Sequence, residues 1–244
     1  MADHLARIFG TEEDRVNCPF FFKIGACRHG DQCSRIHNRP VVSQTIVFKN
    51  MFQNPPAAIA MAEGQAVNDK VAEDAQEHFE AFFEEVFLEL AKYGEVEDMG
   101  VVDNIGDHMI GTVYVKFASE SAAESCMQKI SGRFYAGRLL QPEYCPVTDF
   151  AEARCRQYDD AQCSRGGYCN FVHWKHVPGV VRRRLRKRML ELHPEFRGAE
   201  KPRERKRSRT PPRRKSPRRE TSADRRAKVA QWNREKEQFD ESQL

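Results

Sequence analysis

Two cysteine-rich stretches decide how this sequence folds. Residues 17–37 read NCPFFFKIGACRHGDQCSRIH, and residues 155–173 read CRQYDDAQCSRGGYCNFVH. The first spaces its cysteines and histidine as C-x8-C-x5-C-x3-H, and the second as C-x7-C-x5-C-x3-H. Because the last two spacings are identical, we interpret the two sets as one repeated unit rather than as scattered cysteines.

Each set supplies three thiols and one imidazole, the ligand set of a closed tetrahedral zinc site. A module of about 25–30 residues buries too little apolar surface to fold alone, and zinc binding supplies on the order of 10–16 kcal/mol. The sequence therefore predicts two structural Zn²⁺ ions in two Cys3His fingers, over residues 12–40 and 149–176. The predicted ligands are Cys18, Cys27, Cys33 and His37 in the first finger and Cys155, Cys163, Cys169 and His173 in the second.

The composition bounds the class of protein. The chain has 244 residues and a formal net charge of +4, enough length for one or two small domains. It contains no run of 18 apolar residues and no signal-peptide core at its start, so we expect an intracellular protein that binds no membrane. In a reducing compartment its eight cysteines favour metal binding over disulfides, and the two outside the repeats, Cys126 and Cys145, are expected to be buried thiols.

Aromatic and basic side chains surround the predicted zinc ligands. Exposed rings stack on unpaired bases and arginines contact phosphates or base faces, so this combination indicates single-stranded RNA. The alternative is that the rings form the small core of each finger, and we expect one of the three consecutive phenylalanines of the first finger to face inward. The predicted RNA contacts are Phe20, Phe22, Lys23, Arg28, Ser34, Arg35, Arg156, Gln157, Arg165 and Phe171.

Between the fingers, residues 43–147 alternate strand and helix patterns. Their order, βαββαβ over about 100 residues, is that of an RNA-recognition motif, an α+β fold. We expect strands over residues 45–49, 95–102, 112–117 and 135–143, and helices over residues 74–93 and 121–130.

Two further segments follow the second finger. Residues 178–195 predict a basic helix that packs on the domain through Val181, Leu185, Met189 and Leu192. Residues 196–244 predict a basic, Arg/Ser-like and mostly disordered tail.

The strands that hold RNA in such a motif depart here from its consensus. Residues 110–117 read IGTVYVKF, with Ile110 in place of a basic residue and Thr112 in place of a stacking ring. On the first strand Val47 stands where another ring would be. Residues 43–150 also carry a net charge of −11. We therefore expect a sheet that repels phosphate and binds protein.

The chain resembles the small-subunit family of the U2 snRNP auxiliary factor, a splicing heterodimer. The resemblance lies in the order of its parts: a finger, an altered RNA-recognition domain, a second finger and a basic tail. Residues 17–37, 106–108, 146–150 and 165–167 are similar to that family, and the resemblance covers roughly residues 1–195. It implies a middle domain of the U2AF-homology-motif type, in which an acidic helix and an Arg-x-Phe loop hold a tryptophan-containing peptide. The matching positions are Glu84, Glu85 and Glu89 on the helix and Arg133, Phe134 and Tyr135 on the loop.

The loop departs from the family pattern at two positions. Phe134 stands where the family usually has tryptophan, and Tyr135 stands where the family has phenylalanine. Both changes keep a ring, so we expect partner binding to survive. For the acidic helix, the alternative interpretation is a solvated face with no partner.

The resemblance also implies a function. The two fingers would recognise the AG of single-stranded pre-mRNA at the 3′ splice site, and the large subunit of the factor would be the partner in a nuclear heterodimer that recruits U2 snRNP to the forming spliceosome. The residues leave open a tandem-finger adaptor in mRNA decay or 3′-end processing, although such adaptors have closely linked fingers and no acidic helix. An enzyme is not expected, because neither metal pattern leaves an open coordination position.

A lone tryptophan in the tail, Trp232, follows the basic residues 225–228. One hypothesis is that the tail folds back, or reaches a second copy of the chain, and occupies the Arg133–Tyr135 pocket until the large subunit displaces it. The alternative is a short amphipathic helix over residues 223–239.

Overall fold

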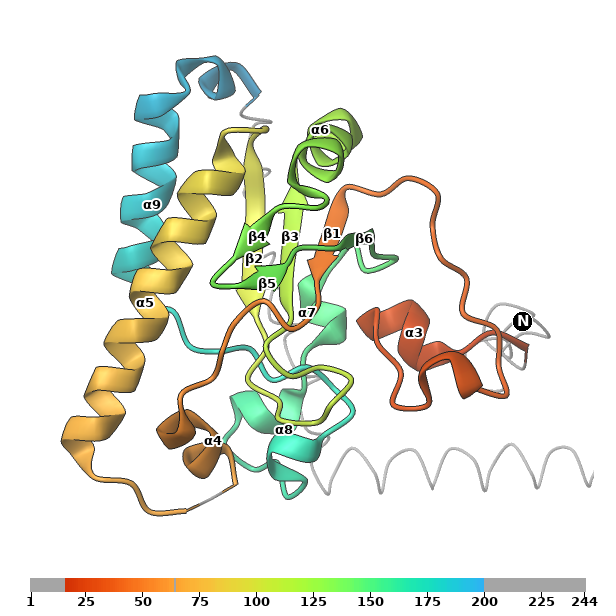
Figure 1. Ribbon diagram of the computed structural model, residues 1–244, viewed down its shortest axis with the longest axis vertical. Helices are drawn as coiled ribbons and strands as arrows, with labels where there is room; N and C mark the ends of the chain where they lie inside the picture. Colours follow the sequence, from red (N-terminus) through yellow and green to blue (C-terminus); the bar gives the residue numbers. More distant parts are fainter. Residues whose placement is uncertain (1–15, 64, 200–244) are drawn as a thin grey trace, which may run out of the picture. The chain divides into compact units, whose positions relative to one another are not determined.

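A four-stranded antiparallel sheet forms the middle of the chain. The computed structural model describes residues 16–63 and 65–199 (Figure 1). The strand order is β2-β3-β1-β6, which confirms the predicted α+β fold with its βαββαβ core. The strands are β1 (Thr45–Phe48), β2 (Val96–Val101), β3 (Val113–Phe117) and β6 (Pro142–Tyr144).

Of the tail expected over residues 196–244, residues 196–199 belong to η3 (Pro194–Ala199) instead of a disordered segment. Residues 200–244, which include Trp232, and residues 12–15 of the expected first finger lie outside the described residues. Among those described, no helix combines the length and the apolar character that crossing a membrane requires.

Three helices pack on one face of the sheet. Helices α5 (Asp69–Ala91) and α6 (Glu120–Ile130) pack against Ile46 and Phe48 of β1. Helix α9 (Gly179–Leu192) runs beside α5 (Figure 1) and extends the same apolar core. The phenylalanine stripe of α5 is buried as its helical spacing predicts, over Phe79, Phe82, Phe83, Val86, Phe87 and Leu90.

The fingers cover the opposite face of the sheet. Val47 and Tyr114 pack there with Ile24 of the first finger and Val172 of the second. Tyr114 is fully buried, and its hydroxyl donates a 2.7 Å hydrogen bond to the carbonyl of Ile24. The expectation of a protein-binding sheet is therefore corrected, because the fingers of the same chain occupy the face that either RNA or a partner would need.

The fingers are built from short helical turns. The first contains α3 (Pro19–Ile24) and η1 (Gly30–Gln32). The second contains α7 (Phe150–Ala153), α8 (Arg156–Asp159) and η2 (Gly166–Tyr168). Because fingers and sheet share a core, the limits of the separate domains stay a prediction.

Two helices differ from the expected pattern. Helix α5 begins at Asp69 rather than at residue 74, since Asn68 caps it by accepting a 3.1 Å hydrogen bond from the backbone N–H of Lys70. A short helix that was not predicted, α4 (Pro56–Ala62), precedes it. The proline in the first turn of α4 is a helix-start signal that the sequence carries.

The expected last strand over residues 135–143 is broken into three pieces. Strands β4 (Phe134–Tyr135) and β5 (Arg138–Leu139) form a hairpin, and only β6 joins the sheet. Ala136 and Gly137 both have positive φ, at 46° and 77°, as a tight two-residue hairpin turn requires. The predicted loop, residues 133–135, therefore lies at this separate hairpin and not in the four-stranded sheet.

The basic helix packs on the domain as predicted, with one correction. Val181, Leu185 and Met189 of α9 are buried, but Leu192 is 59% exposed. It lies at the last turn, where the chain leaves the core for η3 (Pro194–Ala199).

Leu185 and Leu192 give a matched test of how α9 packs on the domain. Leu185→Ala should lower the free energy of unfolding by about 2–5 kcal/mol, because it leaves a cavity in the shared core. Leu192→Ala should change it by less than about 1 kcal/mol, since that side chain is already hydrated. Urea unfolding in the presence of zinc measures both. Equal losses would contradict the docking of α9.

Candidate metal centres and binding surfaces

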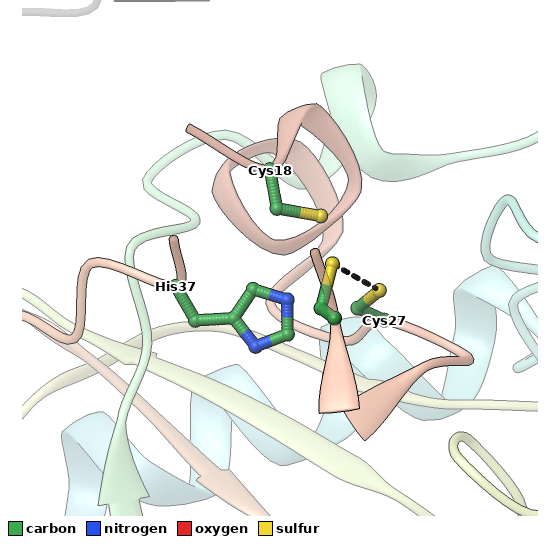
Figure 2. Close-up of side chains that lie close together, drawn as sticks. Cys18, Cys27 and His37 are labelled. Carbon is green, nitrogen blue, oxygen red and sulfur yellow. Dashed lines mark hydrogen bonds between the residues drawn. The ribbon is translucent and has the colours of Figure 1, made fainter. Parts of the chain in front are cut away.

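Four side chains of the first finger converge on one point. The ligand atoms of Cys18, Cys27, Cys33 and His37 lie within 4.8 Å of one another, and Figure 2 shows the three labelled side chains around a common space. The sulfurs of Cys27 and Cys33 are 3.8 Å apart. Tetrahedral Zn–S bonds of about 2.3 Å place two sulfurs about 3.8 Å apart. Nε2 of His37 is buried with no hydrogen-bond partner among the described residues, so it suits a metal.

The second finger repeats this geometry. Its four predicted ligands also lie within 4.8 Å of one another. The sulfur of Cys155 is 3.8 Å from those of Cys163 and Cys169, and Nε2 of His173 is buried without a partner in the described part of the chain. The residues therefore fit two structural zinc ions. Zinc would cross-link each finger and leave no free coordination position.

Burial affects the thiols that zinc must bind. It raises the pKa of Cys27 to about 11 and that of Cys169 to about 11, so both hold their protons at neutral pH in the absence of metal. Zinc binding must therefore release protons.

Each finger supports its histidine ligand with an aromatic ring. The ring of Phe21 stacks on His37 with centroids 4.5 Å apart, and that of Tyr158 stacks on His173 at 4.0 Å. Phe21 is thus the inward-facing ring expected among the three phenylalanines. Phe20 and Phe22 are 37% and 66% exposed.

The two fingers touch each other. The rings of Phe20 and Phe171 meet edge to face with centroids 6.1 Å apart, and the guanidinium of Arg165 lies over Phe171 at 5.9 Å. Arg165 also donates a 3.0 Å hydrogen bond to Gln157. Ten residues were predicted to contact RNA, and all of them are exposed except Phe171, which is half-buried.

A small pocket of about 130 Å³ lies where the fingers meet the loop between β2 and β3. Of the predicted contacts, only Phe20 and Arg28 line it. His29, His108 and Asn170 also line it, and none of the three was predicted because only the fold brings them together. Burial holds the pKa of His108 below its usual value, so its ring is neutral near pH 7 and offers one donor and one acceptor.

A larger groove of about 460 Å³ lies on the helix side of the molecule. Helices α5 and α6 and the β4–β5 hairpin form its walls. Its apolar floor consists of Phe48, Met51, Val86, Leu90, Ile130 and Leu140. Its rim includes five of the six predicted partner contacts, namely Glu85, Glu89, Arg133, Phe134 and Tyr135.

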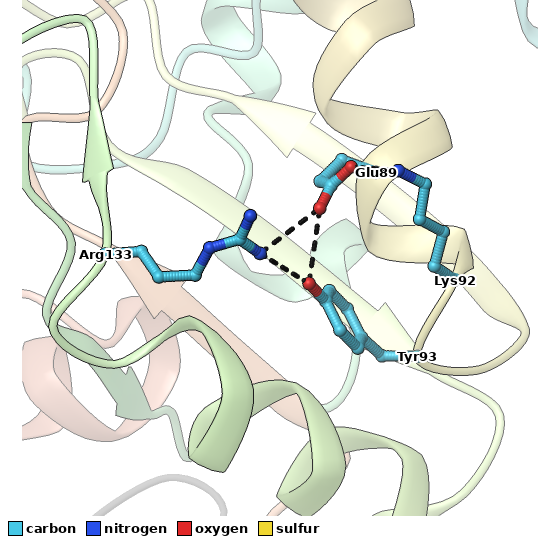
Figure 3. A network of polar contacts seen from close by, with 4 residues as sticks. All are labelled: Glu89, Lys92, Tyr93 and Arg133. Carbon is cyan, nitrogen blue, oxygen red and sulfur yellow. Dashed lines mark hydrogen bonds and ion pairs between the residues drawn. The ribbon is translucent and has the colours of Figure 1, made fainter.

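A polar network fixes the rim of this groove (Figure 3). Arg133 donates to the hydroxyl of Tyr93 at 2.7 Å and to Glu89 at 3.3 Å, and Tyr93 donates to Glu89 at 3.2 Å. Lys92 and these two partners hold the pKa of Glu89 below its usual range, so this carboxylate is charged at neutral pH. Lys92 and Tyr93 were not among the predicted contacts, although both lie one helical turn after Glu89.

The aromatic residues of the hairpin are held differently. Tyr135 donates a 3.1 Å hydrogen bond to Glu85, and burial and this carboxylate raise the pKa of Tyr135 to about 12. Phe134 is 72% exposed. The hairpin therefore presents one anchored ring and one free ring beside the groove.

Glu84 does not line the groove. Its carboxylate accepts a 2.8 Å hydrogen bond from Arg184 of α9 and so forms an ion pair on the other side of α5. The neighbouring Glu85 points to the groove because successive side chains of a helix are about 100° apart. Glu84 was expected with the partner contacts, and the structure instead gives it a contact within the chain.

Comparisons with known proteins agree with this architecture. Residues 13–39 match the zinc finger family of the C-x8-C-x5-C-x3-H type. The chain is 50% identical over 214 residues to the "Splicing factor U2AF 26 kDa subunit" of Bos taurus, covering 86% of this chain and 97% of that protein. The chain belongs to the U2AF small-subunit family.

Relatives from other organisms extend the comparison. The human U2AF 26 kDa subunit is 49% identical over 208 residues, covering 84% of this chain and 94% of that protein. A U2af small-subunit splicing factor of Oryza sativa subsp. japonica is 56% identical over 187 residues, which is 76% of this chain. The matched region spans 60% of the length of the rice relative.

Loss of one ligand tests the metal centres of this U2AF small-subunit chain. Cys33→Ser should reduce the zinc content from two ions to one, because three remaining ligands hold the metal more weakly, and Cys163→Ser should do the same for the second finger. Native mass spectrometry counts the ions. Cys126→Ser is the control, since this buried thiol lies outside both clusters and its variant should keep both ions. Two ions in Cys33→Ser would contradict the ligand assignment.

Proposed function

We propose that this chain is a nuclear splicing-factor subunit that binds the AG of pre-mRNA at the 3′ splice site through both fingers and binds a tryptophan-containing peptide of a large subunit in the groove. Recruitment of U2 snRNP to the forming spliceosome would follow from this pairing. The observation that carries the RNA part is the contact between the two fingers, which joins their aromatic and basic side chains into one surface.

Several features support RNA binding by this surface. Phe20 and Phe171 offer rings at the junction of the fingers, and Arg28 and Arg165 place positive charge beside them. The pocket next to the rings has neutral His108 and the amide of Asn170 in its wall, groups that can hydrogen-bond the edge of a base. The choice of AG rests on the family resemblance.

A binding experiment with short RNAs tests this assignment. The protein, with its large-subunit peptide bound, should prefer an oligonucleotide containing AG over matched CG and AC versions. Phe20→Ala and Phe171→Ala should each weaken binding of the AG oligonucleotide by roughly 5-fold to 150-fold, because a stacked ring contributes about 1–3 kcal/mol.

The control for this experiment is Leu192→Ala, which removes an exposed apolar side chain at the end of α9, outside both the fingers and the groove, and should leave RNA affinity unchanged. Equal affinity for AG, CG and AC would contradict AG recognition. It would favour the other candidate function, a finger-based adaptor in mRNA decay or 3′-end processing.

The groove supports binding of a peptide from a protein partner. Its apolar floor suits a large ring, and Glu85 and Glu89 on its rim suit basic residues beside that ring. The network through Tyr93 and Arg133 holds these side chains in place before a peptide arrives, which reduces the entropy cost of binding. Binding of RNA and of a peptide, without catalysis, accounts for the sites found.

Two glutamate variants distinguish peptide binding in the groove from attraction of the peptide by the overall charge of α5. Glu89→Gln should weaken binding of a peptide with one tryptophan and flanking lysines by about tenfold, or about 1.4 kcal/mol, because it removes a charge from the rim. Glu84→Gln should leave the affinity within about twofold, since Glu84 does not line the groove and pairs with Arg184 on the other side of α5. Isothermal titration calorimetry at physiological salt measures both. Equal weakening would mean that the peptide responds only to the overall charge of α5.

A further inference from the structure

One side chain of the central domain contacts the backbone of the second finger three times. Asn104, in the loop after β2, is 1% exposed. Its Nδ2 donates to the carbonyls of Cys169 at 2.8 Å and of Phe171 at 3.1 Å. Its Oδ1 accepts a 2.7 Å hydrogen bond from the backbone N–H of His173. Two of these three residues are predicted zinc ligands, and the third is the ring at the junction of the fingers.

Backbone hydrogen bonds extend this contact on both sides. The N–H of Asp103 donates to His173 at 2.7 Å, and that of Lys175 donates to Val101 at 2.8 Å. The N–H of Ile105 donates to Gly167 at 2.9 Å. These hydrogen bonds extend the end of β2 into the second finger as a short ladder. The hydrogen bonds of the Asn104 side chain lie in the middle of this ladder.

The first finger has no such contact among the described residues. In the described part of the chain, one hydrogen bond from the sheet domain reaches its backbone, from the hydroxyl of Tyr114 to the carbonyl of Ile24, which is not a ligand. Two of its ligands, Cys33 and His37, are half-buried, whereas the second finger has one half-buried ligand, Cys163, and its Cys169 and His173 are 1% and 2% exposed. The two zinc sites thus differ in access and in outside support.

We propose that Asn104 is a positioning residue of the second finger, which keeps Cys169 and His173 at metal-binding separation and fixes Phe171 against the first finger. An asparagine amide supplies two donors and one acceptor, which matches the two carbonyls and one N–H that it meets. Outer partners that orient metal ligands typically contribute 10-fold to 100-fold in metal affinity. The role of Phe171 in RNA binding rests on the proposed function, but the zinc role does not.

Zinc release from the full-length protein into a colorimetric chelator tests the proposal. The wild type should release zinc in a fast phase from the first finger and a slow phase from the second, and Cys33→Ser should retain only the slow phase. Asn104→Ala should speed the slow phase by about 10-fold to 100-fold and leave the fast phase unchanged. Asn104→Ser, a milder change that keeps one hydrogen-bonding group, should give an intermediate rate.

Asn38→Ala is the matched control, because Asn38 makes an exposed hydrogen bond with Asn17 within the first finger. It should change the slow phase by less than about twofold. An unchanged slow phase in Asn104→Ala would overturn the proposal. So would equal acceleration of both phases, which would reveal a general loss of stability rather than positioning.

An RNA measurement separates this inference from the proposed function. Asn104→Ala should weaken binding of the AG oligonucleotide by about tenfold, through Phe171, and leave binding of the tryptophan peptide unchanged. A faster slow phase with unchanged RNA affinity would support the zinc role of Asn104 and count against RNA recognition by the second finger.

Discussion

The buried ring of Tyr114 links the sheet to both fingers, and the arrangement of the binding surfaces depends on this contact. Its hydroxyl bonds the carbonyl of Ile24 in the first finger, and its ring meets Phe150 and Trp174 edge to face at 6.1 and 5.5 Å. An unpaired carbonyl at this depth would cost about 1–3 kcal/mol. In an RNA-recognition motif this face of the sheet binds nucleotides. Here the same face is covered by two modules, each with a zinc ligand set.

The covered sheet face separates the two candidate binding sites. The proposed RNA surface lies on the fingers, where Phe20 and Phe171 meet, and the groove proposed for the peptide lies across the sheet, between α5 and the β4–β5 hairpin. The rim of the groove contains Glu85 and Glu89, whereas the pocket at the fingers is lined by Arg28 and, among the described residues, by no acidic one. The sites proposed for RNA and for a basic peptide therefore lie on different surfaces of the chain.

The two fingers share a pattern but are held in different ways. Each stacks a ring on its histidine, and each closes its short chain with a parallel bridge, Asn17 to Ile36 in the first and Arg154 to Val172 in the second. Only the second is joined to β2 by a ladder of hydrogen bonds among the described residues. Repetition in sequence thus gave the same local structure without the same support from the rest of the fold.

The sequence by itself determined the metal ligands, the α+β order of the middle domain and the buried stripe of α5, because each depends on local spacing that the chain carries with it. Only the tertiary structure decided which acidic residues face the groove, with Glu85 turned toward it and Glu84 toward Arg184. It also decided that the sheet is covered and that His108 and Asn170 share a pocket. These contacts join residues from distant segments, and no local pattern records them. Side-chain direction and burial arise only when the fingers, loop and helices pack around one sheet.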